Sequence, residues 1–139
     1  MKPLTREWIG KAEGDLAVME REARARKDPV YDSVCFHAQQ CAEKYLKARL
    51  YEAGIKFKPV HDLLVLLNQA LDVEPLWEAL RTDLAFLSGF AVRYRYPGES
   101  ATRVQALAAR AHCRRFRQAA RAALGLDRQG KLAARRKRK

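Results

Sequence analysis

The sequence predicts an all-α protein, an antiparallel four-helix up-and-down bundle with one extra short helix. Three observations support this prediction. Apolar residues recur at helical spacing along most of the chain, no segment alternates in the manner of a β-strand, and short connections separate the periodic segments. A chain of 139 residues fits one domain. We expect the bundle to cover residues 1–125 and a disordered basic tail to cover residues 126–139.

The first predicted helix runs from Thr5, as its N-cap, to Arg26, and packs antiparallel to the next one. The central and longest predicted helix runs from Pro29 to Gly54. Proline suits a first helical turn, Asp28 is an acceptable cap before it, and Gly54 can adopt the left-handed conformation that ends a helix. One face of this helix is apolar and the other is polar.

Three further helices follow in the chain. A short, apolar helix is expected from Asp62 to Leu71, and a fourth helix begins near Pro75. The fourth helix carries leucines along one side, namely Leu76, Leu80, Leu84 and Leu87. Ser100 or Thr102 can cap the last helix, which ends at Gly125. Small apolar residues share one face of that helix: Val104, Ala108, Ala111, Ala119 and Ala122.

The positive charge of the chain is concentrated in its last part. The net charge is +12; residues 1–100 are balanced, and residues 101–139 hold 13 Lys and Arg residues but only one acid, Asp127. An arginine stripe forms another face of the last helix: Arg103, Arg110, Arg114, Arg117 and Arg121. Such a stripe is either a solvated face or a surface that takes its counter-charge from RNA, DNA or an acidic protein.

The stretch FHAQQCAEKYLKARLYEAG, followed by HDLLVLL, resembles the signature of the HEPN family (higher eukaryote and prokaryote nucleotide-binding domain). The segments EWIGKAEGDLAVM and RYRYPGES are similar to two other patterns of that family, and the matches span most of residues 5–100. The resemblance implies a helical bundle, binding of a nucleotide or nucleic acid, a homodimer or higher homo-oligomer, and a separately encoded minimal nucleotidyltransferase as partner, as in a toxin–antitoxin pair.

The ribonucleases of the HEPN family carry an Arg followed, after four to six residues, by a His. Here the corresponding positions after Arg93 are residues 98–100, and those after Arg95 are residues 100–102, and neither window holds a histidine. We therefore expect no catalytic residue and favour a non-catalytic binding module. A metal-independent HEPN ribonuclease toxin and a generic RNA-binding accessory protein are the alternatives.

The Arg-Tyr-Arg-Tyr turn is the first candidate for a nucleotide or phosphate site, through Arg93, Tyr94, Arg95 and Tyr96. Arginine presents a fork of donors that suits phosphate, and tyrosine rings can stack on a base. In the alternative interpretation, Arg93 and Arg95 pair with acids or carbonyls and only hold the turn.

The central helix and the segment after it supply further candidates. Lys44, Lys47 and His61 are candidate nucleotide-binding residues, although a histidine next to Asp62 at a helix start is more typical of a capping role. The polar face of the central helix is either solvated or an interface. The candidate interface residues are Phe36, Gln40 and Tyr51.

Composition points away from metal and membrane partners. The three cysteines are odd in number and form no C-x-x-C pair, and the histidines do not form a metal-ligand set. The longest aliphatic run, Leu63–Leu67, is too short to cross a bilayer. We expect no metal, no cofactor and no membrane partner, and a cytoplasmic protein.

Overall fold

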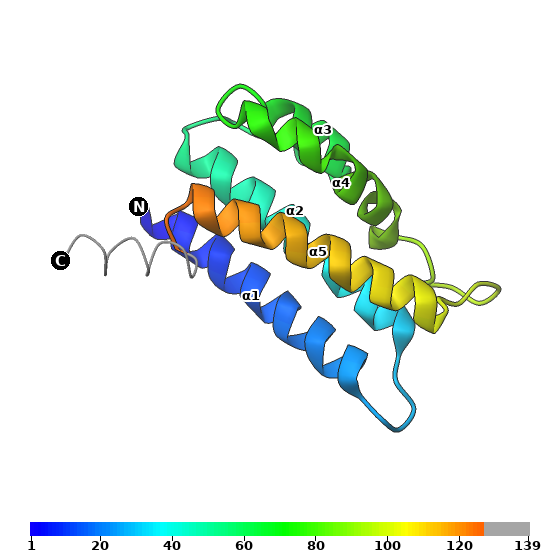
Figure 1. Cartoon of the computed structure of the whole chain (residues 1–139). Helices are drawn as coiled ribbons and strands as arrows, with labels where there is room; N and C mark the ends of the chain where they lie inside the picture. Colours follow the sequence, from blue (N-terminus) through cyan, green and yellow to red (C-terminus); the bar gives the residue numbers. More distant parts are fainter. Residues whose placement is uncertain (127–139) are drawn as a thin grey trace.

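The computed structural model describes residues 1–126 of the chain (Figure 1). All regular elements of the described part are helices and none is a strand, so the predicted all-α class is confirmed. In order, the elements are α1 (Pro3–Arg24), α2 (Tyr31–Glu52), α3 (Leu63–Ala70), the 3₁₀ helix η1 (Pro75–Leu80), α4 (Arg81–Leu87), the 3₁₀ helix η2 (Ser88–Ala91) and α5 (Arg103–Ala123). The predicted basic tail lies, apart from Leu126, outside the described residues. No helix within residues 1–126 is long and apolar enough to cross a membrane.

Helix α2 occupies the centre of the bundle, with α1 and α5 packed along it and the α3–α4 pair on another side (Figure 1). Its apolar positions are buried because the three neighbours enclose them. The largest fully buried side chains include Tyr45 and Leu46 of α2, Met19 of α1 and Phe116 of α5. Trp77 of η1 meets Phe116 edge to face, with ring centroids 5.1 Å apart.

The first two helices begin at positions other than those predicted. Helix α1 begins at Pro3, so Thr5 lies inside the helix, and its buried hydroxyl donates to Glu52 instead of capping. Helix α2 begins at Tyr31 and not at Pro29. The reason is the turn before it: Asp28 adopts a left-handed φ of 48°, and the Val30 N–H donates to Glu22 at 2.7 Å. These contacts reverse the chain between α1 and α2.

The end of α2 follows the prediction, and contacts with α2 set the direction of the next helix. Gly54 has a φ of 73°, and the N–H of Ile55 returns to the carbonyl of Leu50. The chain then doubles back, because the carbonyl of His61 accepts from Gln39 while Glu74 pairs with Arg49 further along α2. Helix α3, the extra short helix, therefore runs in the same direction as α2.

The predicted fourth helix is broken into η1, α4 and η2. The tighter 3₁₀ turn of η1 buries Trp77 and leaves Leu76 87% exposed, so the predicted leucine face does not hold at its first position. Thr102, one of the two predicted caps, precedes α5, and its side chain forms a capping box with Gln105. Gly125, with a φ of 73°, follows the helix as predicted. The buried face of α5 is Ala106, Ala109, Cys113, Phe116 and Ala120, so the small apolar face that includes Val104, Ala111 and Ala122 points outward.

Candidate functional site

The turn between η2 and α5 is held in an unusual backbone conformation. Tyr94 has a φ of 69°, in the left-handed region that non-glycine residues rarely occupy. Two contacts fix the ends of the turn: the N–H of Arg93 donates to the carbonyl of Gly89, and the N–H of Ala101 donates to Asp32 of α2 at 2.6 Å. Backbone strain of this kind concentrates at functional sites, where the surrounding structure sustains it.

A hollow of about 300 Å³ lies between this turn and the beginning of α2. Its lining consists of Asp32, Ser33, Phe36, Arg93, Tyr94 and Arg95. Three of these residues were predicted from the Arg-Tyr-Arg-Tyr sequence, and Phe36 was predicted as an interface residue. Asp32 and Ser33 were not anticipated. Asp32 lies one turn before Phe36 on α2, so helical spacing from Phe36 is the signal that could have indicated it.

Both arginines of the hollow lie against aromatic rings. The guanidinium of Arg93 lies 4.8 Å from the ring centroid of Tyr94, and that of Arg95 lies 6.0 Å from the ring centroid of Phe36. Arg93 also pairs with Glu99 at 3.6 Å, but both side chains are largely exposed, and such a pair contributes little. The arrangement is thus compatible with both predicted roles of the arginines. Their contacts with the rings help to shape the turn, and the edges of the guanidiniums can still donate to a phosphate.

Two features of the hollow bear on its chemistry. The hydroxyl of Tyr94 is buried without a hydrogen-bond partner in the described part of the chain, whereas Tyr96 is 77% exposed. Next to the hollow, burial and the carboxylate of Asp32 raise the pKa of the Cys35 thiol to about 11, and Arg93 opposes this shift only in part. The thiol is therefore protonated at neutral pH and is not a nucleophile.

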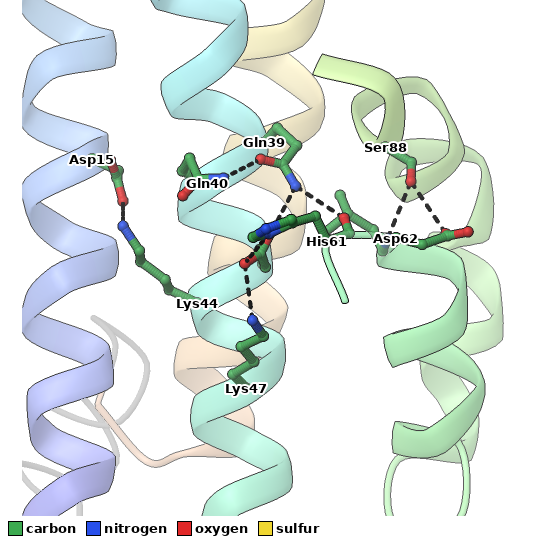
Figure 2. A network of polar contacts seen from close by, with 10 residues as sticks. Asp15, Gln39, Gln40, Lys44, Lys47, His61, Asp62 and Ser88 are labelled. Carbon is green, nitrogen blue, oxygen red and sulfur yellow. Dashed lines mark hydrogen bonds and ion pairs between the residues drawn. The ribbon is translucent and has the colours of Figure 1, made fainter. Parts of the chain in front are cut away.

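The other nucleotide-binding candidates lie in a polar network on α2 (Figure 2). Lys44 donates to Asp15 of α1 at 2.5 Å. Lys47 is only 8% exposed, donates to Glu43 at 3.0 Å, and lies 5.7 Å from the ring centroids of both Trp8 and Phe57. Both lysines thus pair with carboxylates of the bundle. The sequence had instead suggested that they lie on a solvated face or bind a nucleotide.

His61 joins the same network from the segment before α3 (Figure 2). Its Nδ1 lies 3.0 Å from Glu43, and its side chain remains 69% exposed. Burial acts to raise the pKa of Glu43, but the hydrogen bonds from Gln39, Lys47 and His61 outweigh it and hold that pKa below its ordinary value. The capping role belongs to the neighbouring Asp62, which accepts from the N–H groups of Leu64 and Val65. His61 thus lies beside an ionised carboxylate. Neither His61 nor Glu43 lines the hollow at the Arg-Tyr-Arg-Tyr turn.

The arginine stripe of α5 receives its counter-charge from α1. Arg110 and Arg114 both donate to Glu20, and Arg117 donates to Glu13 with two bonds of 2.8 and 2.7 Å. These three arginines therefore have a counter-charge within the bundle, and nucleic-acid binding by the stripe stays a prediction. The spacing of Glu13 and Glu20, two helical turns apart on one face, was the signal that sequence reasoning missed.

The remaining two arginines of the stripe differ from each other. Arg121 donates to the Tyr45 hydroxyl at 3.0 Å and to the carbonyl of Leu126, whereas Arg103 is exposed. The Tyr45 hydroxyl in turn donates to Glu13. Burial, as the main cause, and the bond to Glu13, as the second, raise the pKa of Tyr45 well above its ordinary value. The hydroxyl therefore stays protonated.

The candidate interface residues are spread along α2, with Phe36 in its first half, Gln40 near its middle and Tyr51 at its end. Phe36 is half-buried beneath Arg95, and Gln40 donates to Gln39 at 2.6 Å. Tyr51 is half-buried, carries the ammonium of Lys2 5.2 Å from its ring centroid, and lines a second hollow of about 380 Å³. The other lining residues of that hollow are Lys2, Gly54, Ile55, Lys56 and Phe57.

All three histidines contact carboxylates. His37 lies 2.7 Å from Asp15, His61 lies 3.0 Å from Glu43, and His112 lies 2.6 Å from Asp83. No group of His, Cys, Asp and Glu within residues 1–126 has the arrangement of a metal site.

These features define a small helical-bundle domain in which an arginine- and tyrosine-rich turn, placed before the last helix, borders a hollow. The chain belongs to the HEPN domain family, whose sequence model matches residues 5–123. Membership of this family supports a nucleotide-binding, RNA-binding or ribonuclease-like module. Comparisons with the curated proteins and with the solved structures returned no match.

Proposed function

We propose that the chain is a non-catalytic HEPN-type module that binds a nucleotide or nucleic acid at the hollow beside the Arg93–Tyr96 turn. The proposal rests on one observation: two guanidiniums and two aromatic rings surround a space of about 300 Å³. A hollow of that size is at the lower end of the range for small-molecule sites. The guanidiniums suit a phosphate and the rings suit a base.

The absence of catalysis is supported by the sequence of the turn and by the state of the nearby groups. Neither arginine of the turn is followed by a histidine at the spacing found in HEPN ribonucleases. The Cys35 thiol has a raised pKa, and each histidine is engaged with a carboxylate on another element. The residues that line the hollow therefore include no group suited to proton transfer at neutral pH.

The proposal includes a homodimer and a partner protein. Half-buried apolar side chains of α2, Phe36 and Tyr51, support self-association, as does the family to which the chain belongs. The sequence has no Gly-rich phosphate-binding loop of its own. We therefore assign any nucleotidyl transfer to a separately encoded minimal nucleotidyltransferase, in a toxin–antitoxin-like pair in the cytoplasm.

The test is a calorimetric titration of the full chain with AMP and ATP. Arg93→Ala and Arg95→Ala should each weaken binding about tenfold or more, because each removes a charge-assisted contact to phosphate. Arg81→Ala is the matched control, since Arg81 pairs with Glu78 on another part of the surface. Unchanged affinity in the Arg93 and Arg95 variants would refute the site.

The same preparation distinguishes the alternatives. Metal-independent cleavage of RNA that disappears in Arg93→Ala would establish the ribonuclease hypothesis in place of ours. Co-expression with a small nucleotidyltransferase encoded beside the gene should yield a complex that survives purification. Polyanion binding with no nucleotide binding and no such complex would favour a generic RNA-binding accessory protein.

A further inference from the structure

A polar cluster at the junction of α4 and α5 is not used by the site described above. Asp83 of α4 is 7% exposed, lies 2.6 Å from Nδ1 of His112, and accepts from Nε of Arg115 at 2.8 Å. Sequence reasoning did not single out Asp83 or Arg115. One buried carboxylate thus positions a histidine and an arginine of the next helix.

The hydrogen-bond geometry leaves part of the arginine available. Because Nδ1 of His112 is so close to a carboxylate, it must carry the proton and donate to Asp83. It cannot then accept from Nη2 of Arg115, which lies 2.9 Å away. Arg115 therefore uses its Nε–H on Asp83 and keeps the donors of its terminal nitrogens, and its side chain is 56% exposed.

An aromatic side chain flanks the same histidine. The ring of Phe86 lies 4.5 Å from that of His112, tilted by 32°, and the residue is 38% exposed. From Phe86 a row of aromatic contacts leads to the turn, through Phe90 at 5.6 Å and then Tyr94 at 5.8 Å. Arg93 lies against the far end of this row. The middle of this row is internal packing, because Phe90 is only 4% exposed, whereas Phe86 at one end and Arg93 at the other are exposed.

We propose that Phe86 and Arg115 form a second subsite that receives a single-stranded nucleic acid, with a base on Phe86 and a phosphate on Arg115. The inference rests on the proposed function, because it extends the site at the turn. A single strand is specified since stacking on a side chain requires an unpaired base face. The only acid in the cluster, Asp83, is already engaged by His112 and Arg115, so the outer surface is complementary to an anion.

The test compares a short ligand with a long one on the full chain. AMP reports the hollow at the turn, and a fluorescent single-stranded oligoribonucleotide of about eight nucleotides reports both subsites. Arg115→Ala and Phe86→Leu should each weaken oligonucleotide binding roughly fivefold or more and leave AMP affinity unchanged. Phe86→Leu keeps an apolar side chain against Phe90 and removes only the planar ring.

Salt dependence gives an independent measure of the phosphate contact. In Arg115→Ala the slope of log affinity against log salt should fall by about 0.7, the value for one phosphate of a single strand. The control is Lys11→Ala, which removes one exposed charge from α1, on the side of the bundle away from α3 and α4 (Figure 1), and should change the affinity less than twofold. Melting temperatures of all variants establish that they are folded.

Three results would overturn the inference, and they differ from one another. If AMP and the oligonucleotide bind in an Arg93-dependent manner and both Arg115→Ala and Phe86→Leu bind the oligonucleotide as tightly as the wild type, only the second subsite is refuted. If the wild type binds neither ligand, the proposed function fails together with this inference. Equal affinity for a duplex of the same sequence would also refute the stacking role of Phe86.

Discussion

Arg117 of α5 donates two hydrogen bonds to the carboxylate of Glu13 of α1, from Nε at 2.8 Å and from Nη2 at 2.7 Å. This bidentate pair joins the first helix to the last. We predict that Arg117→Met lowers the free energy of unfolding by roughly 1.5–3 kcal/mol, since it removes charge-assisted bonds to a partly buried carboxylate. Urea denaturation followed by circular dichroism measures the change. The control, Arg103→Met, affects an exposed arginine and should cost less than about 0.5 kcal/mol.

Glu20 gives the stability of the bundle a defined dependence on pH. Burial acts to raise its pKa, but the hydrogen bonds from Arg110 and Arg114 outweigh burial and hold the pKa at about 2, below the ordinary value of 4.5. Because the folded pKa is the lower one, this contribution to stability is complete above pH 4.5 and is lost as the pH falls toward 2.

The substitution Glu20→Gln tests this dependence. The variant should be less stable than the wild type at pH 7, and the difference between the two should shrink progressively below pH 4.5. Unfolding free energies measured at a series of pH values provide the comparison. A difference that stays constant down to pH 2.5 would show that the carboxylate of Glu20 is not held ionised by the arginines.

Lys47 offers a way to separate a structural from a ligand-binding role on α2. The substitution Lys47→Met leaves the buried Glu43 without its cation, so we predict a loss of roughly 3–5 kcal/mol of unfolding free energy. The double substitution Lys47→Met with Glu43→Met should recover much of that loss. Lys58→Met, at an exposed position, is the control. Loss of nucleotide affinity in a fully stable Lys47→Met protein would contradict the structural role.

The proposed dimer is tested by charge insertion at the candidate interface. Phe36→Asp and Tyr51→Asp should each convert the protein to a monomer, because a buried carboxylate without a partner is costly at an interface. Light scattering coupled to size exclusion, at tens of micromolar protein, reports the mass. Leu76→Asp places the same charge at an exposed apolar residue of η1 and should leave the mass unchanged. A wild-type monomer under these conditions would refute the dimer.

The sequence was sufficient for the features that are encoded locally. Helical periodicity, the Thr102 cap and the terminators Gly54 and Gly125 each depend on a few neighbouring residues, and the structure has all of them. The start of α2 was missed because the left-handed turn at Asp28 depends on the reach of Glu22 from the preceding helix. The direction of α3 could not be read from the sequence, because it is fixed by contacts of His61 and Glu74 with residues of α2 that are distant in sequence.

The candidate site was predictable only in part, for the same reason. The Arg-Tyr-Arg-Tyr turn could be recognised from its residue types, whereas its partners Asp32 and Ser33 come from another helix. For the arginine stripe, the sequence pattern showed the charged residues but not the acids that pair with them. Taken alone, α5 has no acid to balance it, yet Glu13 and Glu20 reach it from α1 once the helices pack. Charge patterns on one helix indicate a partner without indicating which element supplies it.

The pairing of α1 with α5 also has a consequence for the order of folding. Glu20 and Arg114 are 94 positions apart, and Glu13 and Arg117 are 104 apart, so these bonds require closure of nearly the whole chain. The hairpin of α1 and α2 closes over a much shorter loop, so we expect it to form in the transition state before α5 docks. Substitutions of Arg117 should then act chiefly on the unfolding rate and leave the folding rate nearly unchanged. The arginines of α5 would in that case determine how long the native bundle persists, while the α1–α2 hairpin determines how fast it forms.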